Sequence, residues 1–175
     1  MNNSKPTLVL MAGLSGAGKS SLALALASKL QWYLVYRDGY REVLIREGLS
    51  EEMASWIAYE LAFDTAWRVL TKQKASVIFD SSALHSFVLT WALNVVRHSA
   101  NARLRVVLCI ADQDLRRRRV QSRPPQDWYT KVDPVTRDDY LRYYKHLPPD
   151  TLILNTAKPL EECLTIVKYY LLSDW

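Results

Sequence analysis

The sequence predicts an α/β fold in which helices cover both faces of a central, five-stranded parallel sheet. Short apolar runs alternate with longer helical patterns along the 175 residues, and such alternation is typical of parallel sheets joined by helical crossovers. The apolar runs are nearly continuous, as expected of strands that are buried on both faces. A glycine-rich turn also separates the first strand pattern from the first helix pattern.

The expected elements follow one another without a repeat or a low-complexity linker, so we expect a single domain over residues 1–175. The strand patterns cover residues 7–12, 33–37, 76–80, 103–111 and 151–155. The helix patterns cover residues 19–30, about 51–72, 86–98, about 113–123, 135–146 and 159–172. Ser50, followed by two glutamates, is a suitable N-cap for the longest helix. The adjacent prolines in "RPPQDWYTKVDP" (123–134) predict a loop.

The composition indicates a soluble protein of the cytoplasm that does not associate with a membrane. Hydrophobic residues make up 49% and charged residues 23% of the chain, and no run approaches the ~18 uncharged apolar residues of a membrane helix. Cys109 and Cys163 lie in apolar segments without metal-ligand spacing, so we expect neither a disulfide framework nor a cysteine metal site. The net charge of +5 is compatible with an anionic substrate.

"GLSGAGKS" (13–20) matches the phosphate-binding pattern G-x-x-x-x-G-K-[S/T] in full, between a strand and a helix. Its glycines let backbone N–H groups point at the β- and γ-phosphates, which lie at the positive end of the following helix. We expect Lys19 to reach the outer phosphate oxygens and the Ser20 hydroxyl to bind Mg²⁺. The predicted cofactors are therefore ATP and Mg²⁺, and the predicted nucleotide-binding residues are Gly13, Ser15, Gly16, Ala17, Gly18, Lys19, Ser20 and Ser21.

Other motifs narrow the class of nucleotide-binding protein. The N-K-x-D and D-x-x-G motifs of switch GTPases do not occur, nor does the LSGGQ-like signature of transporter ATPases. A small α/β chain with a basic insert before its last strand resembles the P-loop kinases, the group that includes adenylate kinase. The resemblance implies a three-layer P-loop NTPase fold and a lid, at about 113–134, whose arginines close on ATP.

The arginines of "DLRRRRVQSR" (114–123) fit such a lid. Arg116, Arg119 and Arg123 are spaced along one face of a helix. We expect Arg119 to bind ATP and Arg123 to stabilise the charge on the transferred phosphoryl group; the alternative is a solvated helix face.

The second strand pattern leads into "RDGYR" (37–41). Asp38 lies just beyond the carboxyl end of this strand, where α/β sheets place their sites, and Arg41 follows one helical turn later. The spacing alone fits a role in a site no better than the alternative, in which Asp38 is an N-cap and pairs with Arg41 at the surface. However, "RDGYR" resembles the "RDDYR" element of the phage-type polynucleotide 5′-kinases. This resemblance implies that Asp38 is the general base and that Arg41 contacts a phosphate of the acceptor.

Two further elements support this resemblance. "IFDSS" (78–82) resembles the D-T-N element of the family, which implies that Asp80 lies beside the substrate. Arg119 and Arg123 repeat its R-x-x-x-R spacing. Separately, Asn155 and Thr156 end the last strand, at a position where relatives contact adenine. The chain departs from the family at Gly39, which replaces an acid, and at Ser81 and Ser82, which replace Thr-Asn.

The sequence thus predicts an ATP-dependent kinase that acts on the 5′-hydroxyl of a nucleic acid or nucleotide, as in RNA repair. A small-molecule kinase is an alternative, because zeta-toxin-like and chloramphenicol kinases also place an acid after the second strand. A module that binds ATP without transferring phosphate, or a binding partner in a larger repair assembly, is a further alternative. Trp56, Trp67 and Trp91 lie on predicted helix faces, and we expect them in the core.

Overall fold

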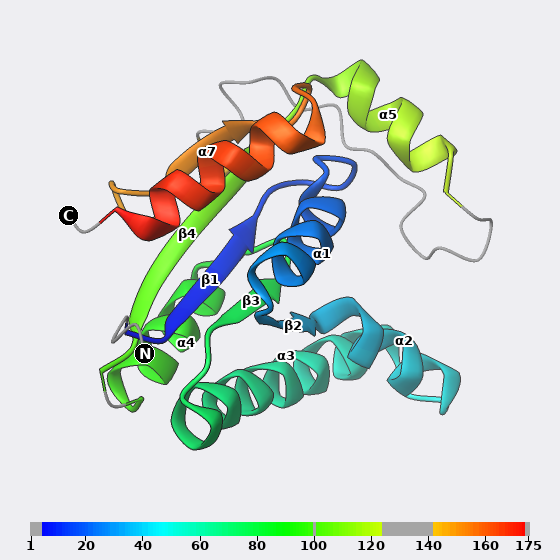
Figure 1. Cartoon of the computed structure of the whole chain (residues 1–175). Coiled ribbons are helices and arrows are strands. Elements are labelled where there is room, and N and C mark those ends of the chain that lie inside the picture. The colour runs from blue at the N-terminus through cyan, green and yellow to red at the C-terminus, as the bar shows by residue number, and fades with distance from the viewer. Residues whose placement is uncertain (1–4, 100, 124–141, 174–175) are drawn as a thin grey trace.

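The computed structural model describes residues 5–99, 101–123 and 142–173 and contains one parallel sheet of five strands (Figure 1). The strands lie in the order β2-β3-β1-β4-β5, and every neighbouring pair is parallel. Their bounds are Thr7–Ala12 for β1, Tyr33–Tyr36 for β2, Val77–Asp80 for β3, Arg103–Ile110 for β4 and Leu152–Asn155 for β5. Each predicted strand is confirmed to within one residue at either end.

Helices cover both faces of the sheet, as predicted (Figure 1). Their bounds are Lys19–Leu30 for α1, Arg37–Arg46 for α2, Glu51–Arg68 for α3, Ser86–Arg97 for α4, Gln113–Gln121 for α5 and Leu160–Leu172 for α7. A π-helical turn, η1 (Val69–Gln73), extends α3. The predicted helix over 135–146 falls mostly outside the described residues.

The side chains of β1 alternate between two hydrophobic cores, as a strand buried on both faces requires. Leu8 and Leu10 pack in the core beneath α3 and α4. Val9 and Met11 pack in the opposite core, beneath α1 and α7. This two-sided burial holds the end of β1, and therefore the phosphate-binding turn that follows it, in a fixed position.

Helix α2 is an element that the sequence did not predict. Its sequence, "RDGYREVLIR", is largely polar and contains a glycine, so it lacks the apolar stripe by which a helix is recognised. The helix forms because two of its arginines, Arg37 and Arg41, are buried against α3. Its N-cap is Tyr36, which makes no side-chain capping bond. Asp38 therefore lies in the first turn of the helix and is not its N-cap.

The start of α3 agrees with the sequence, whereas one of its tryptophans does not. The Ser50 hydroxyl accepts a hydrogen bond from the Met53 amide at 3.3 Å, which confirms the predicted cap. Trp56, which was expected in the core, is 47% exposed. It stacks on Phe87 of α4, with the ring centroids 4.9 Å apart, so only one of its faces is covered by this partner. Within the described residues, no helix is long and apolar enough to cross a bilayer.

Candidate active site

The turn between β1 and α1 has the backbone of a phosphate-binding loop. Gly13, Gly16 and Gly18 have positive φ angles of 135°, 77° and 81°, which side chains disfavour. A Cβ atom on Gly13 would lie 2.4 Å from the Cys109 carbonyl oxygen, and one on Gly16 would lie 2.5 Å from that of Arg116. Both glycines are therefore required for the loop to pass so close to β4 and α5.

Lys19 and Ser20 open α1 at the end of this loop, and Asp80 ends the neighbouring strand β3. The Lys19 ammonium donates a hydrogen bond to the Leu14 carbonyl oxygen at 3.1 Å. Burial lowers the pKa of Lys19, and the negative charge of Asp80 opposes this shift. Burial likewise raises the pKa of Asp80, which is only 3% exposed; Lys19 and a hydrogen bond with Ser20 oppose that shift.

The pairing of Ser20 with Asp80 fits a site for Mg²⁺. This ion prefers oxygen ligands, and it is typically held by one or two protein groups while water and substrate phosphates complete its shell. Within residues 5–99, 101–123 and 142–173, no group of three or more His, Cys, Asp or Glu side chains could hold a metal ion. A hydroxyl and a carboxylate beside the phosphate loop are the donors that a nucleotide-bound Mg²⁺ needs.

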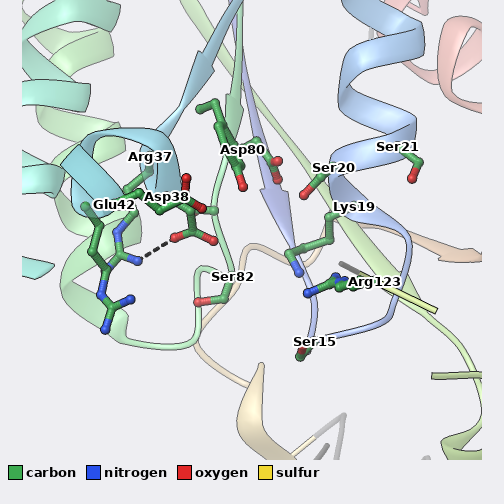
Figure 2. A pocket seen from close by; sticks show the side chains of 13 residues that line it. Ser15, Lys19, Ser20, Ser21, Arg37, Asp38, Glu42, Asp80, Ser82 and Arg123 are labelled. Atoms are coloured by element: carbon green, nitrogen blue, oxygen red, sulfur yellow. Dashed lines mark hydrogen bonds and ion pairs between the residues drawn. The ribbon is translucent and has the colours of Figure 1, made fainter. Parts of the chain in front are cut away.

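Asp38 lines the same cavity as Lys19, Ser20 and Asp80. The volume of this cavity is about 260 Å³. Figure 2 shows Asp38 on one side of this cavity and Lys19 and Arg123 on the other, with Asp80 between them and beside Ser20. We call it the acceptor cavity. The sequence predicted Asp38 just beyond the end of the second strand. In the sheet β3 lies between that strand, β2, and β1, yet Asp38 still lines the cavity beside the phosphate loop.

Two buried arginines of α2 also line the acceptor cavity. Arg41 is 7% exposed and donates a hydrogen bond to Glu51 of α3 at 3.0 Å. Arg37 is 6% exposed and donates a hydrogen bond to Asp38 at 2.6 Å. Sequence reasoning selected Arg41 and missed Arg37, although both belong to the "RDGYR" element.

A second cavity, of about 370 Å³, lies on the other side of the phosphate loop and is lined by Gly16, Gly18 and Thr156, among others. We call it the nucleotide cavity. Two residues, Ser21 and Arg123, line both cavities. The two spaces therefore meet beside the first turn of α1.

The arginines of α5 have different environments. Arg116, predicted to share an open face with the others, is instead fully buried, because the backbone of α5 packs against Gly16 at this point. Arg119 lines the nucleotide cavity and donates hydrogen bonds to Thr156, to its hydroxyl at 2.9 Å and to its carbonyl oxygen at 2.6 Å. Arg123 is the last described residue before 124–141, so the second half of the predicted lid, residues 124–134, lies outside the described residues.

Comparisons with known proteins identify the fold. Residues 8–147 match a family described as "AAA domain". A putative kinase from Chloroflexus aurantiacus superposes with a TM-score of 0.73 at 21% identity, covering 97% of this chain and 98% of that one. APS kinase from Mycobacterium tuberculosis, in complex with AMPPNP and APS, superposes with a TM-score of 0.69 at 22% identity, covering 97% of this chain and 99% of that one. A gluconokinase from Sinorhizobium meliloti superposes with a TM-score of 0.61 at 19% identity, covering 97% of this chain and 93% of that one. No curated protein matches the sequence. The architecture is a three-layer P-loop NTPase fold.

Proposed function

The chain belongs to the AAA domain family, and we propose that it is a P-loop kinase that transfers the γ-phosphate of ATP to a hydroxyl acceptor. One observation carries this proposal. The carboxylate of Asp38 and the ammonium of Lys19 line one cavity, and that cavity meets the nucleotide cavity at Ser21 and Arg123. A donor phosphate and an acceptor hydroxyl can thus be held face to face, and positioning of this kind accounts for much of the catalysis of phosphoryl transfer.

On this proposal, ATP lies along the phosphate loop with its base in the nucleotide cavity near Thr156. The loop amides and the N-terminus of α1 hold the phosphates, and Lys19 binds the outer oxygens. Ser20 and Asp80 would hold Mg²⁺, which supplies neutralising charge to the phosphates. This assigns Asp80 to the donor side of the site, because Lys19 and Ser20, at the start of α1, both act on its carboxylate.

Asp38 orients the acceptor hydroxyl and accepts its proton as the oxygen bonds to the γ-phosphorus and the bond to ADP breaks. The transition state of this transfer is loose, so charge stabilisation by Lys19 and Arg123 matters more than nucleophilic push. Arg41 contacts an anionic group of the acceptor. Its partner Glu51 is exposed, so the guanidinium can exchange this carboxylate for a phosphate or carboxylate of the substrate.

Two acceptor classes follow from different observations. The resemblance of "RDGYR" to the polynucleotide 5′-kinase element supports a nucleic-acid 5′-end or a nucleotide. The similarity to a gluconokinase and to APS kinase supports a small-molecule acceptor. The acceptor cavity is also small: its volume of about 260 Å³ lies just below the range of about 300–1,000 Å³ for small-molecule sites, so it suits a compact acceptor.

Label transfer from γ-labelled ATP tests the proposal and separates the two classes. The protein is incubated with Mg²⁺, the labelled ATP and one candidate acceptor at a time. The candidates are 5′-hydroxyl RNA and DNA oligomers, 3′-nucleotides, unphosphorylated nucleosides and small hydroxy acids and sugars. We expect label on an acceptor that bears an anionic group. ATP turnover that labels no acceptor would overturn the proposal in favour of a non-transferring module, and equal labelling of nucleosides and 3′-nucleotides would overturn the role of Arg41.

A further inference from the structure

Arg37, the first residue of α2, has an environment that differs from that of an ordinary surface arginine. Its guanidinium carbon lies 4.1 Å from the centroid of the Tyr59 ring, within range of a cation–π interaction. One terminal nitrogen, Nη2, donates a hydrogen bond to the Ser55 hydroxyl at 2.5 Å. The other, Nη1, donates to Oδ1 of Asp38 at 2.6 Å, the bond drawn in Figure 2. Burial leaves this guanidinium little freedom to move.

The groups that hold Arg37 belong to α3. Ser55 and Tyr59 are four residues apart and therefore lie on the same face of that helix. Tyr59 is itself buried in the core with Phe63 and Phe79, so its ring is a fixed platform. Contacts thus run from the hydrophobic core through α3 to Arg37, and from Arg37 to the carboxylate in the acceptor cavity.

We propose that Arg37 is a positioning residue, which fixes the carboxylate of Asp38 for the incoming hydroxyl; this rests on the proposed function. Its bond engages Oδ1, and we assign Oδ2 to the acceptor hydroxyl. An aspartate in the first turn of a helix can adopt several rotamers, and one held in place before the substrate arrives does not lose that freedom during the reaction. Only the planar fork of arginine can stack on a ring while it donates to two separate oxygens.

Arg41 has a different role in this arrangement. It is also buried, but its hydrogen bond runs to the exposed Glu51 and not to Asp38. We therefore expect substitutions of Arg41 to raise the KM for the acceptor, and substitutions of Arg37 to lower kcat.

A double-mutant cycle tests whether Arg37 acts through Asp38. The readout is label transfer to whichever acceptor the wild-type protein labels. We expect Arg37→Lys to lower kcat by about 10²-fold, as a misplaced catalytic group would, while the dissociation constant for ATP is unchanged. In an Asp38→Asn background, the same substitution should change kcat by less than about twofold, because the group it positions is already lost. A full second loss of about 10²-fold would overturn the inference.

Two variants on α3 keep the test sharp if Arg37→Lys folds poorly. Neither Ser55 nor Tyr59 lines the acceptor cavity, so any effect on kcat must act at a distance. We expect Ser55→Ala or Tyr59→Leu to lower kcat by about tenfold, with ATP binding unchanged. The matched control is Thr65→Ala, which removes a different bond between the helices, the one between the hydroxyls of Tyr40 and Thr65 at 3.0 Å. A similar loss in this control would show that α2 had merely loosened, and it would overturn the inference.

The outcomes separate this inference from the proposed function. If the wild-type protein labels none of the acceptors, the proposed function fails and the positioning role fails with it. If the wild-type protein labels an acceptor and the cycle is additive, the kinase proposal stands and the role of Arg37 alone is overturned.

Discussion

At the scale of single residues, the proposed phosphate transfer depends most on the carboxylate of Asp38. It lies in the first turn of α2, opposite Lys19, and the acceptor hydroxyl would lie between them. We predict that Asp38→Asn lowers kcat by about 10²–10⁴-fold, because a general base is lost while the side-chain shape is kept. Binding of ATP, measured by titration calorimetry, should be unchanged, since Asp38 does not line the nucleotide cavity. Wild-type turnover in this variant would remove Asp38 from the reaction.

The burial of Asp80 predicts how the stability of the protein depends on pH. Burial raises its pKa, so the folded protein holds this proton more tightly than the unfolded chain does. Its contribution to stability is therefore fully present below the unfolded pKa and is lost as the pH rises through the folded pKa. Asp80→Asn cannot undergo this loss. We expect the Tm of the variant, relative to the wild-type protein, to increase as the pH is raised above the ordinary pKa of an aspartate, about 3.9. Thermal unfolding at increasing pH measures the difference, and a constant or falling difference would contradict the prediction.

At the scale of elements, α5 joins the phosphate loop to the end of the sheet. Arg119 bridges this helix to Thr156, and Arg123 reaches the point where the two cavities meet. We predict that Arg123→Gln lowers kcat on the order of 10³-fold, as the loss of an arginine that stabilises the transferred phosphoryl group does. The matched control is Arg118→Gln, an exposed arginine of α5 five residues before Arg123, and it should keep wild-type activity. A loss below about tenfold in the Arg123 variant would indicate an ordinary surface role.

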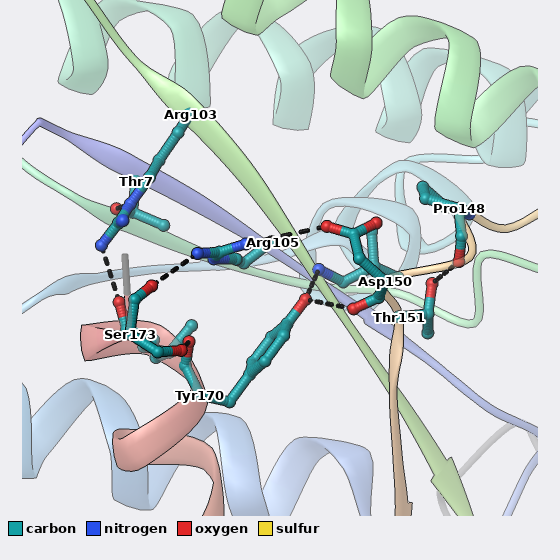
Figure 3. Close-up of polar contacts among 10 residues, drawn as sticks. Thr7, Arg103, Arg105, Pro148, Asp150, Thr151, Tyr170 and Ser173 are labelled. Carbon is teal, nitrogen blue, oxygen red and sulfur yellow. Dashed lines mark hydrogen bonds and ion pairs between the residues drawn. The ribbon is translucent and has the colours of Figure 1, made fainter. Parts of the chain in front are cut away.

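The start of β4 and the end of α7 are joined by polar contacts at the other edge of the sheet (Figure 3). Pairing with β5 begins only at Val107, so the preceding residues of β4 are available to this helix. Arg105 donates a hydrogen bond to the Ser173 carbonyl oxygen at 2.7 Å, and its guanidinium carbon lies 5.2 Å from the centroid of the Tyr170 ring. Tyr170 in turn donates a hydrogen bond to the Asp150 carbonyl oxygen at 3.1 Å. The positive charge of Arg105 also interacts favourably with the negative, C-terminal end of the α7 dipole.

Removing these contacts should lower the stability of the protein without lowering its catalytic activity. Arg105→Met keeps the apolar stem but removes the buried donor, and we expect the free energy of unfolding to fall by about 2 kcal/mol. The activity per folded molecule should be unchanged, because the site lies at the carboxyl ends of the strands and Arg105 near the amino end of β4. Denaturant titration and label transfer measure the two quantities. The exposed Arg97→Met on α4 is the control, and an equal loss of stability there would contradict the assignment.

The elements that the sequence predicted well are those with a local signal, and these include the edge strands β2 and β5, which are only partly buried. Every strand is a short apolar run, and the loop before α1 has a required order of glycines, so both could be recognised locally. Helix α2 could not, because its buried residues include two arginines whose partners lie on another helix. The same reason hid Arg37: its role depends on Ser55 and Tyr59, which are distant in sequence. Asp80 was recognised as a site residue, but its side of the site depends on Ser20.

For the whole molecule, we propose that residues 1–175 form one domain that unfolds as a unit. Strand β1 contributes to the cores on both faces of the sheet, so neither layer of helices can separate without exposing it. We predict a single calorimetric transition whose calorimetric and van't Hoff enthalpies agree. MgATP at about a hundred times its dissociation constant should stabilise the protein by about 2.7 kcal/mol. Lys19→Met should lose most of this shift, and two separate transitions would contradict a single domain.

The two cavities that meet at Ser21 and Arg123 also define the shape of an inhibitor. If donor and acceptor occupy them as proposed, one compound that joins adenosine to the acceptor through a short polyphosphate bridge would fill both at once. Tethering makes the second contact intramolecular, so such a bisubstrate ligand should bind more tightly than either half alone. The length of bridge that binds most tightly would then measure the reach of the transfer.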